Sequence, residues 1–199
     1  MSSTAVQSHS ESSASVLPQR RFTQEEYFAM ADAGVFGEDD SVELIDGHIV
    51  EMSPENSPHR VSIAKATDVF VRALDDRPYF LQSQSTLPLD EWNVPEPGLA
   101  VLQGAPDDML EEEPEVLLII EVADTSLERD RSAKQALYAQ QGIAEYWILN
   151  LQDRTLEVYW EPDDSGYRQR RTWSEDETVT PRFEDAPSFD VEALLPAKS

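Results

Sequence analysis

The sequence predicts an α/β (α+β) domain in which a mixed central sheet is flanked by helices. Three observations predict this class: a hairpin signal near residue 46, an apolar run at 116–122 typical of a buried strand, and an amphipathic stretch between that run and another apolar segment at 145–151. Strand, helix and strand in this order imply a parallel crossover, whereas a tight hairpin implies antiparallel pairing. The sheet is therefore expected to contain both kinds of pairing.

The first predicted element is a short helix that ends at about Ala33. Thr23 and Glu26 have the spacing of a capping box, in which the N-cap side chain and the N3 side chain satisfy each other's backbone N–H groups. Phe22 is placed to pack against Tyr27 as a hydrophobic staple. These signals fix the start of the helix at residue 23 or 24.

A β-hairpin is predicted around Asp46-Gly47, a dipeptide that favours the two-residue turns of hairpins. The flanking segments 42–45 and 48–52 are short and rich in strand-forming residues. Because side chains alternate along a strand, Glu43 and Leu44 should lie on opposite faces of the hairpin.

A helix over 59–74 and strands over 79–87 and 99–102 follow, because apolar residues recur first at helical and then at strand spacing. The segment 103–115 contains six acidic and no basic residues, and we interpret it as a solvated connection. After it, the pattern predicts a central strand over 116–122, a helix over 130–141 that stops at Gly142, and strands over 145–151 and 156–160. The polar remainder, to about Leu195, is expected to close an edge of the sheet.

Size and composition predict one folded domain over residues 21–199, preceded by a disordered tail over 1–20. The chain has 199 residues, 40% of them hydrophobic, and the first twenty are rich in serine and poor in large apolar side chains. The sequence contains no run of about 20 apolar residues, so no membrane span is expected. It contains no cysteine, which agrees with a cytoplasmic location.

The charge of the chain disfavours a broad nucleic-acid-binding surface. The formal net charge is -25, from 40 acidic and 15 basic residues, and such a field repels phosphate backbones. DNA stays a candidate partner only if a cation or a small basic patch offsets this repulsion. We interpret Arg168, Arg170 and Arg171 as a solvated strand edge that compensates nearby acids. The aromatic residues of the last predicted strands are assigned to the core or to a homodimer surface: Tyr146, Trp147, Tyr159 and Trp160.

Glu121 and Lys134 are the residues most suggestive of chemistry. Glu121 lies near the C-terminal end of the apolar run 116–122, and an ionised carboxylate in such a strand is costly unless a cation or hydrogen bonds compensate it. Lys134 lies on the apolar stripe of the following helix, so its ammonium should approach the sheet. One interpretation is a structural ion pair. The other is a metal beside Glu121, with Lys134 stabilising an anionic group.

Several spaced motifs follow one another between about Phe22 and Trp160. They are Glu43-Leu44-Ile45-Asp46-Gly47-His48-Ile49-Val50, Met52-Ser53-Pro54, His59, Glu121-Val122-Ala123-Asp124-Thr125-Ser126, Asp130, Lys134, Tyr138, Gly142-Ile143 and Glu145-Tyr146-Trp147. In this order they resemble the Uma-type restriction endonuclease family, formerly a domain of unknown function, which is similar to the PD-(D/E)XK phosphodiesterases. The resemblance implies a restriction-endonuclease-like mixed sheet flanked by helices.

The resemblance also implies a Mg²⁺ or Mn²⁺ site formed by an aspartate on one strand and an acid on the next, with a lysine nearby. Glu121 would be the acid, and Lys134 would be the lysine, which in this family lies in the following helix rather than at Ala123. Glu43 would be an accessory acid near the metal. His59 would be an accessory polar group at a helix N-terminus, or a surface or capping residue.

The expected aspartate is replaced by Gly98, which offers no ligand. Glu96 lies two positions earlier, on the same face if the segment is extended, and is the candidate replacement ligand. The sequence therefore supports two functions. The first is metal-dependent hydrolysis of phosphodiesters in DNA, impaired by the loss at Gly98. The second is a catalytically inactive nuclease-fold module for binding or assembly.

Overall fold

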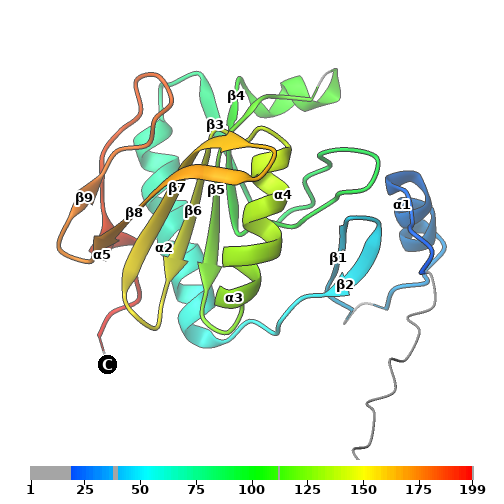
Figure 1. Cartoon of the computed structure of the whole chain (residues 1–199). Coiled ribbons are helices and arrows are strands. Elements are labelled where there is room, and N and C mark those ends of the chain that lie inside the picture. The colour runs from blue at the N-terminus through cyan, green and yellow to red at the C-terminus, as the bar shows by residue number, and fades with distance from the viewer. Residues whose placement is uncertain (1–18, 38–39, 112, 199) are drawn as a thin grey trace, which may run out of the picture.

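A six-stranded mixed sheet lies at the centre of the computed structural model, which describes residues 19–37, 40–111 and 113–198 (Figure 1). Its strand order is β3-β4-β5-β6-β7-β8, in which β5 and β6 are parallel and the other neighbours are antiparallel. The strands are β3 (Tyr79–Ser83), β4 (Leu99–Gln103), β5 (Val116–Ala123), β6 (Glu145–Asn150), β7 (Thr155–Asp163) and β8 (Gly166–Ser174). The mixed sheet and its parallel crossover are thus confirmed.

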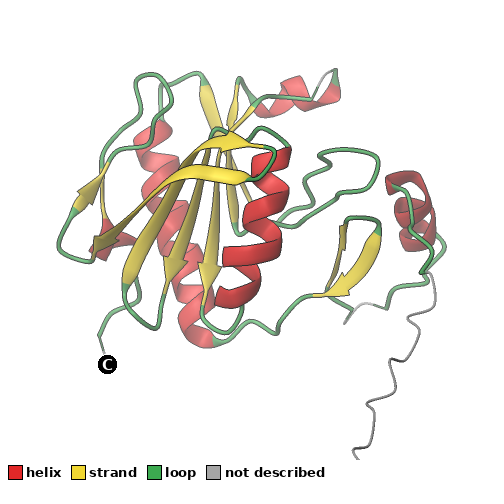
Figure 2. Ribbon diagram, viewed as in Figure 1, coloured by secondary structure: helices red, strands yellow, loops and turns green. Residues whose placement is uncertain are grey.

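Helices cover both faces of this sheet (Figure 2). On one face lie α2 (Ser57–Leu74) and the C-terminal elements β9 (Thr178–Val179), β10 (Phe189–Asp190) and α5 (Val191–Leu194). The other face packs against α4 (Gln135–Gln140). Alternation along β5 divides its side chains between the two cores: Leu118 and Ile120 join the first, and Ile119 joins the second.

The N-terminal elements form a separate unit beside the main sheet (Figure 1). It contains α1 (Gln24–Asp32), which has the predicted capping box, and the predicted hairpin of β1 (Val42–Ile45) and β2 (His48–Glu51). Asp46 and Gly47 have φ values of 48° and 73°, as a turn with two left-handed residues requires. The hairpin contacts the long β3–β4 connection through reciprocal backbone hydrogen bonds between Leu44 and Val94. This contact positions Glu43 next to the sheet.

The crossover helix differs from its predicted form. It begins earlier, with α3 (Leu127–Arg129), and continues through a π-helical turn over Asp130–Lys134 before α4. π-turns inside α-helices are rare and often occur at functional sites. Here the turn brings both of its end residues, Asp130 and Lys134, into the interior, where they are 2% and 3% exposed.

Two strands also differ from the sequence prediction. β3 ends at Ser83 rather than at residue 87, because Gln84 adopts a left-handed φ of 45°. No bounds were predicted for β8, because most of its side chains are polar and exposed, but it contains the arginines assigned to a solvated strand edge and closes the edge of the sheet as expected of this region. The acidic segment 103–115 contains a 3₁₀ turn over Pro106–Leu110.

The predicted tail falls mostly on residues 1–18, which lie outside the described residues. Within the described ranges, none of the helices has the length and apolar character needed to cross a membrane.

Candidate active site

Two buried carboxylates share one lysine at the C-terminal end of β5. The Nζ atom of Lys134 lies 2.9 Å from Oε1 of Glu121 and 3.0 Å from Oε2 of Glu43. The three side chains come from β5, the π-turn and β1, and none of the residues is more than 7% exposed. The structure therefore brings together the acid, the lysine and the accessory acid that the family resemblance implies, and we call them the Glu43–Lys134–Glu121 cluster.

Each oxygen of Glu121 is bound by a fixed donor. Oε1 accepts a hydrogen bond from the buried Tyr138 hydroxyl at 2.9 Å as well as from Lys134. Oε2 accepts one from the backbone N–H of Gly98 at 3.2 Å. Tyr138 lies one helical turn after Lys134, so the same side of the crossover helix provides both side-chain donors. Burial raises the pKa of the Tyr138 hydroxyl well above its usual value, and the nearby Glu121 raises it further, so this group stays a hydrogen-bond donor.

Lys134 is a permanent cation in this environment. Burial alone would lower its pKa, but Glu121 and Glu43 outweigh that effect, and the net shift is upward. A lysine held in this way does not act as a general base near neutral pH. It supplies one positive charge to a site that contains two carboxylates.

Glu43 is less completely satisfied than Glu121. Its Oε2 accepts from the backbone N–H of Glu96 at 3.3 Å in addition to its contact with Lys134. Its Oε1 is buried and has no hydrogen-bond partner among the described residues. The guanidinium of Arg129 lies 3.9 Å from Oε1.

Gly98 marks the main departure from the expected site, and its surroundings are closed. A Cβ atom built at this position would lie 2.9 Å from Cδ1 of Ile63 and 3.0 Å from the carbonyl oxygen of Ile120. Real Cβ atoms rarely approach other atoms so closely, so a larger residue requires the end of the Ile63 side chain or the carbonyl group of Ile120 to move. The expected aspartate is thus absent, and core atoms crowd the position that its Cβ would occupy. This packing involves contacts between distant segments that the sequence alone does not reveal.

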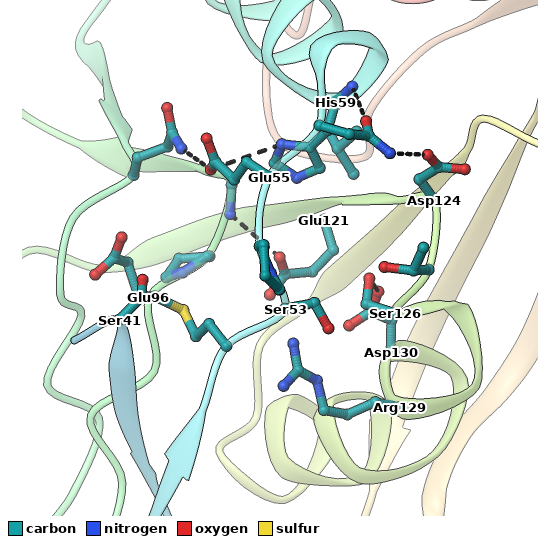
Figure 3. Close-up of a pocket in the computed structure, with 18 of the residues that line it drawn as sticks. Ser41, Ser53, Glu55, His59, Glu96, Glu121, Asp124, Ser126, Arg129 and Asp130 are labelled. Atoms are coloured by element: carbon teal, nitrogen blue, oxygen red, sulfur yellow. Dashed lines mark hydrogen bonds and ion pairs between the residues drawn. The ribbon is translucent and has the colours of Figure 1, made fainter. Parts of the chain in front are cut away.

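The Glu96 carboxylate does not join the cluster. In Figure 3 it points away from the carboxylate of Glu121, and it makes no hydrogen bond or ion pair with the described residues. Burial raises the pKa of Glu96, and the nearby Glu43 raises it further. Its structural contribution is the backbone N–H that binds Glu43.

His59 lies in the first turn of α2 and lines the same pocket as Glu121. Its Nδ1 is 3.6 Å from Glu55, and its backbone N–H is capped by the side chain of Asn56. The helix-terminal position matches the sequence expectation, and no contact of the side chain with the cluster is present among the described residues.

Asp130 is a site residue whose role the sequence did not assign. It lines the pocket near Glu121 (Figure 3), and its carboxylate accepts a hydrogen bond from the Ser126 hydroxyl at 2.6 Å. Burial, followed by the charge of Glu121, raises the pKa of Asp130 to about 7. The available signal was its place four residues before Lys134, which in a helix implies a shared face.

The fold of this chain is shared with a crystal structure described as that of "a putative nuclease belonging to DUF820" from Anabaena variabilis, with a TM-score of 0.67 and 16% identity over 87% of this chain and 97% of that chain. Residues 24–192 match the Uma2 family, described as "Putative restriction endonuclease", and the chain belongs to this family. No curated protein matches the chain.

The magnesium ion implied by the family does not fit the residues present. No group of three or more histidine or acidic side chains within the described part of the chain is arranged to hold a metal ion. Hard cations need several oxygen ligands. Here both carboxylates of the cluster already bind the ammonium of Lys134, and Gly98 provides no oxygen.

Proposed function

We propose that this chain is a non-cleaving member of its nuclease family, in which Lys134 has become the permanent counter-ion of the two acids. In this role the Glu43–Lys134–Glu121 cluster stabilises the junction of hairpin, sheet and crossover helix, and the protein works as a binding or assembly module. The observation that carries the proposal is the position of Nζ of Lys134, within 3.0 Å of both carboxylates.

The energetics of burial support a structural role for the cluster. Removal of one member of a buried ion pair costs about 3–5 kcal/mol, because the remaining charge is left uncompensated. Lys134 pairs with both acids at once, Tyr138 and the N–H group of Gly98 also bind Glu121, and the N–H group of Glu96 also binds Oε2 of Glu43. Because these contacts hold both carboxylates in place, Glu43 and Glu121 are poorly suited to leave Lys134 and bind a divalent cation.

The distribution of basic residues supports the same proposal. Strong non-specific binding of nucleic acid needs lysine and arginine side chains that can displace counter-ions. Arg168, Arg170 and Arg171 instead pair with Asp163, Glu157 and Glu177, respectively. The pocket itself is lined by more acids than bases and would repel a phosphate group.

Metal-dependent cleavage of DNA is the second candidate, and the unpaired Oε1 of Glu43 favours it. A buried carboxylate oxygen without a donor is uncommon and attracts a cation. In that case Glu121, with Glu96 as the replacement for the missing aspartate, would hold Mg²⁺ or Mn²⁺, and Lys134 would stabilise charge on the reacting group. This requires the carboxylate of Glu96 to turn toward Glu121.

A cleavage assay separates the two candidates. Supercoiled plasmid, labelled single-stranded DNA and labelled RNA are incubated with the wild type in Mg²⁺ and in Mn²⁺, beside Glu121→Gln and the exposed control Glu25→Gln. We expect the wild type to cleave no faster than Glu121→Gln. Cleavage by the wild type and by Glu25→Gln that Glu121→Gln lacks would refute the proposal and establish the second candidate.

A further inference from the structure

A second concave region, unrelated to the acidic pocket, lies beside Gln82 of β3, between the loop 86–89 and a lining formed by Met109 and residues 113, 114 and 116. Its cavity of about 390 Å³ shares no lining residue with the acidic pocket. Most of its lining is apolar: Leu87, Pro88, Leu89, Leu102, Met109, Pro114 and Val116. We call this region the β3 groove. Met109 is 46% exposed and the adjacent Leu110 is 87% exposed, so apolar surface continues beyond the cavity.

Acids that have no internal counter-ion lie on the segment that borders the β3 groove. Glu113 lines the groove itself, and Asp107, Asp108 and Glu111 lie on the same segment as Met109. None of these four acids forms a salt bridge with any residue in the described ranges. We call them the acidic rim of the groove.

Gln82 adds a polar contact point to this apolar region. Its side-chain oxygen is buried and accepts no hydrogen bond from the described residues, whereas its amide nitrogen donates to Ser85. A buried acceptor without a donor costs free energy, and an incoming N–H group would remove that cost.

We propose that the β3 groove is the docking site for a basic amphipathic segment of a partner protein. Apolar side chains of the segment would occupy the cavity next to Met109, and its lysine or arginine side chains would face the acidic rim. Charge complementarity selects this occupant. A second copy of the chain, at a net charge of -25, would bring like charges together at the rim.

The inference is tested with a short fluorescein-labelled peptide that carries leucines at helical spacing between lysines. A companion peptide has serine in place of each leucine and therefore keeps the charge alone. Fluorescence anisotropy measures binding to the wild type, to Met109→Ser and Glu113→Lys in the groove, and to Val35→Ser and Glu25→Lys as exposed controls on the N-terminal unit. All four positions are exposed or on the surface, and thermal melts verify that each variant is folded.

We expect the leucine–lysine peptide to bind the wild type and both controls, and each groove variant to bind about tenfold more weakly. The effect of Glu113→Lys should shrink as salt screens the charges, and that of Met109→Ser should persist.

Four outcomes would overturn the inference. The first three are failure of the leucine–lysine peptide to bind the wild type, equally tight binding of the serine companion, and groove variants that bind like their controls. The fourth is a wild-type dimer that Met109→Ser dissociates in analytical ultracentrifugation, because the groove would then belong to a second copy. None of these results depends on cleavage of nucleic acid, so this test and that of the proposed function fail independently.

Discussion

Gly98→Ala tests whether the place of the missing ligand is closed by packing. The added Cβ would lie 2.9 Å from Cδ1 of Ile63 and 3.0 Å from the carbonyl oxygen of Ile120. Overpacking of this kind typically costs about 1–3 kcal/mol. Replacement of a glycine whose φ is not left-handed otherwise stabilises a protein by about 0.4–1 kcal/mol through the unfolded chain. We therefore expect a net loss of about 1–2 kcal/mol in the free energy of unfolding.

Ile63→Val provides the partner for a double-mutant cycle, because valine lacks the Cδ1 atom that the new Cβ would meet. Alone, Ile63→Val should cost about 0.5–1.5 kcal/mol. In the Ile63→Val protein, Gly98→Ala should cost about 1 kcal/mol less than in the wild type, because only the close contact with the carbonyl of Ile120 remains.

Urea unfolding measures the stability of the wild type, of the two single variants and of the double variant. The four free energies are comparable when the m-value is the same for all of them. Gly37→Ala is the matched control, because its Cβ would meet Asp40 at an ordinary 3.6 Å. Equal stability of Gly98→Ala and the wild type, or strict additivity in the cycle, would refute the view that this corner is closed.

Three further predictions concern the cluster and its neighbours. Lys134→Met should lower the free energy of unfolding by about 3–5 kcal/mol in thermal or urea melts, because it leaves Glu43 and Glu121 buried without a counter-ion; a loss below about 1 kcal/mol would mean that the pair is hydrated. Tyr138→Phe should cost about 1.5–3 kcal/mol by removing a hydrogen bond to a charged carboxylate, and no change would contradict the contact. The raised pKa of Asp130, about 7 against about 3.9 in the unfolded chain, means that the native state binds the extra proton between these values. The stability of the wild type relative to Asp130→Asn should thus fall as pH rises from about 4 to about 7 and stay level above that, and a difference independent of pH would refute the assignment.

Local signals in the sequence predicted much of the fold. The capping box at Thr23 and the turn at Asp46-Gly47 depend on neighbouring residues only, and both formed as expected. The crossover from β5 to β6 followed from the alternation of apolar segments. By contrast, β8 is an edge strand with mostly exposed polar side chains, and its backbone pairs with β7. Such a strand has no hydrophobic period to detect.

The candidate site, too, could be predicted only where its contacts join segments that are near in sequence. The convergence of Glu121 and Lys134 could be inferred because strand and helix are adjacent in the chain and each has a defined face. The second acid was expected only as an accessory group, since the approach of β1 to β5 is a long-range contact. The packing of Ile63 against Gly98 is likewise tertiary, so the sequence reveals a missing ligand but not that its place is filled.

The most direct test of the central claim is a calorimetric titration of the wild type with Mg²⁺, with Glu121→Gln as the control. If Lys134 is the permanent counter-ion of Glu43 and Glu121, the wild type should give no saturable heat beyond that of the control. Saturable binding of one Mg²⁺ per chain that Glu121→Gln loses would contradict the account.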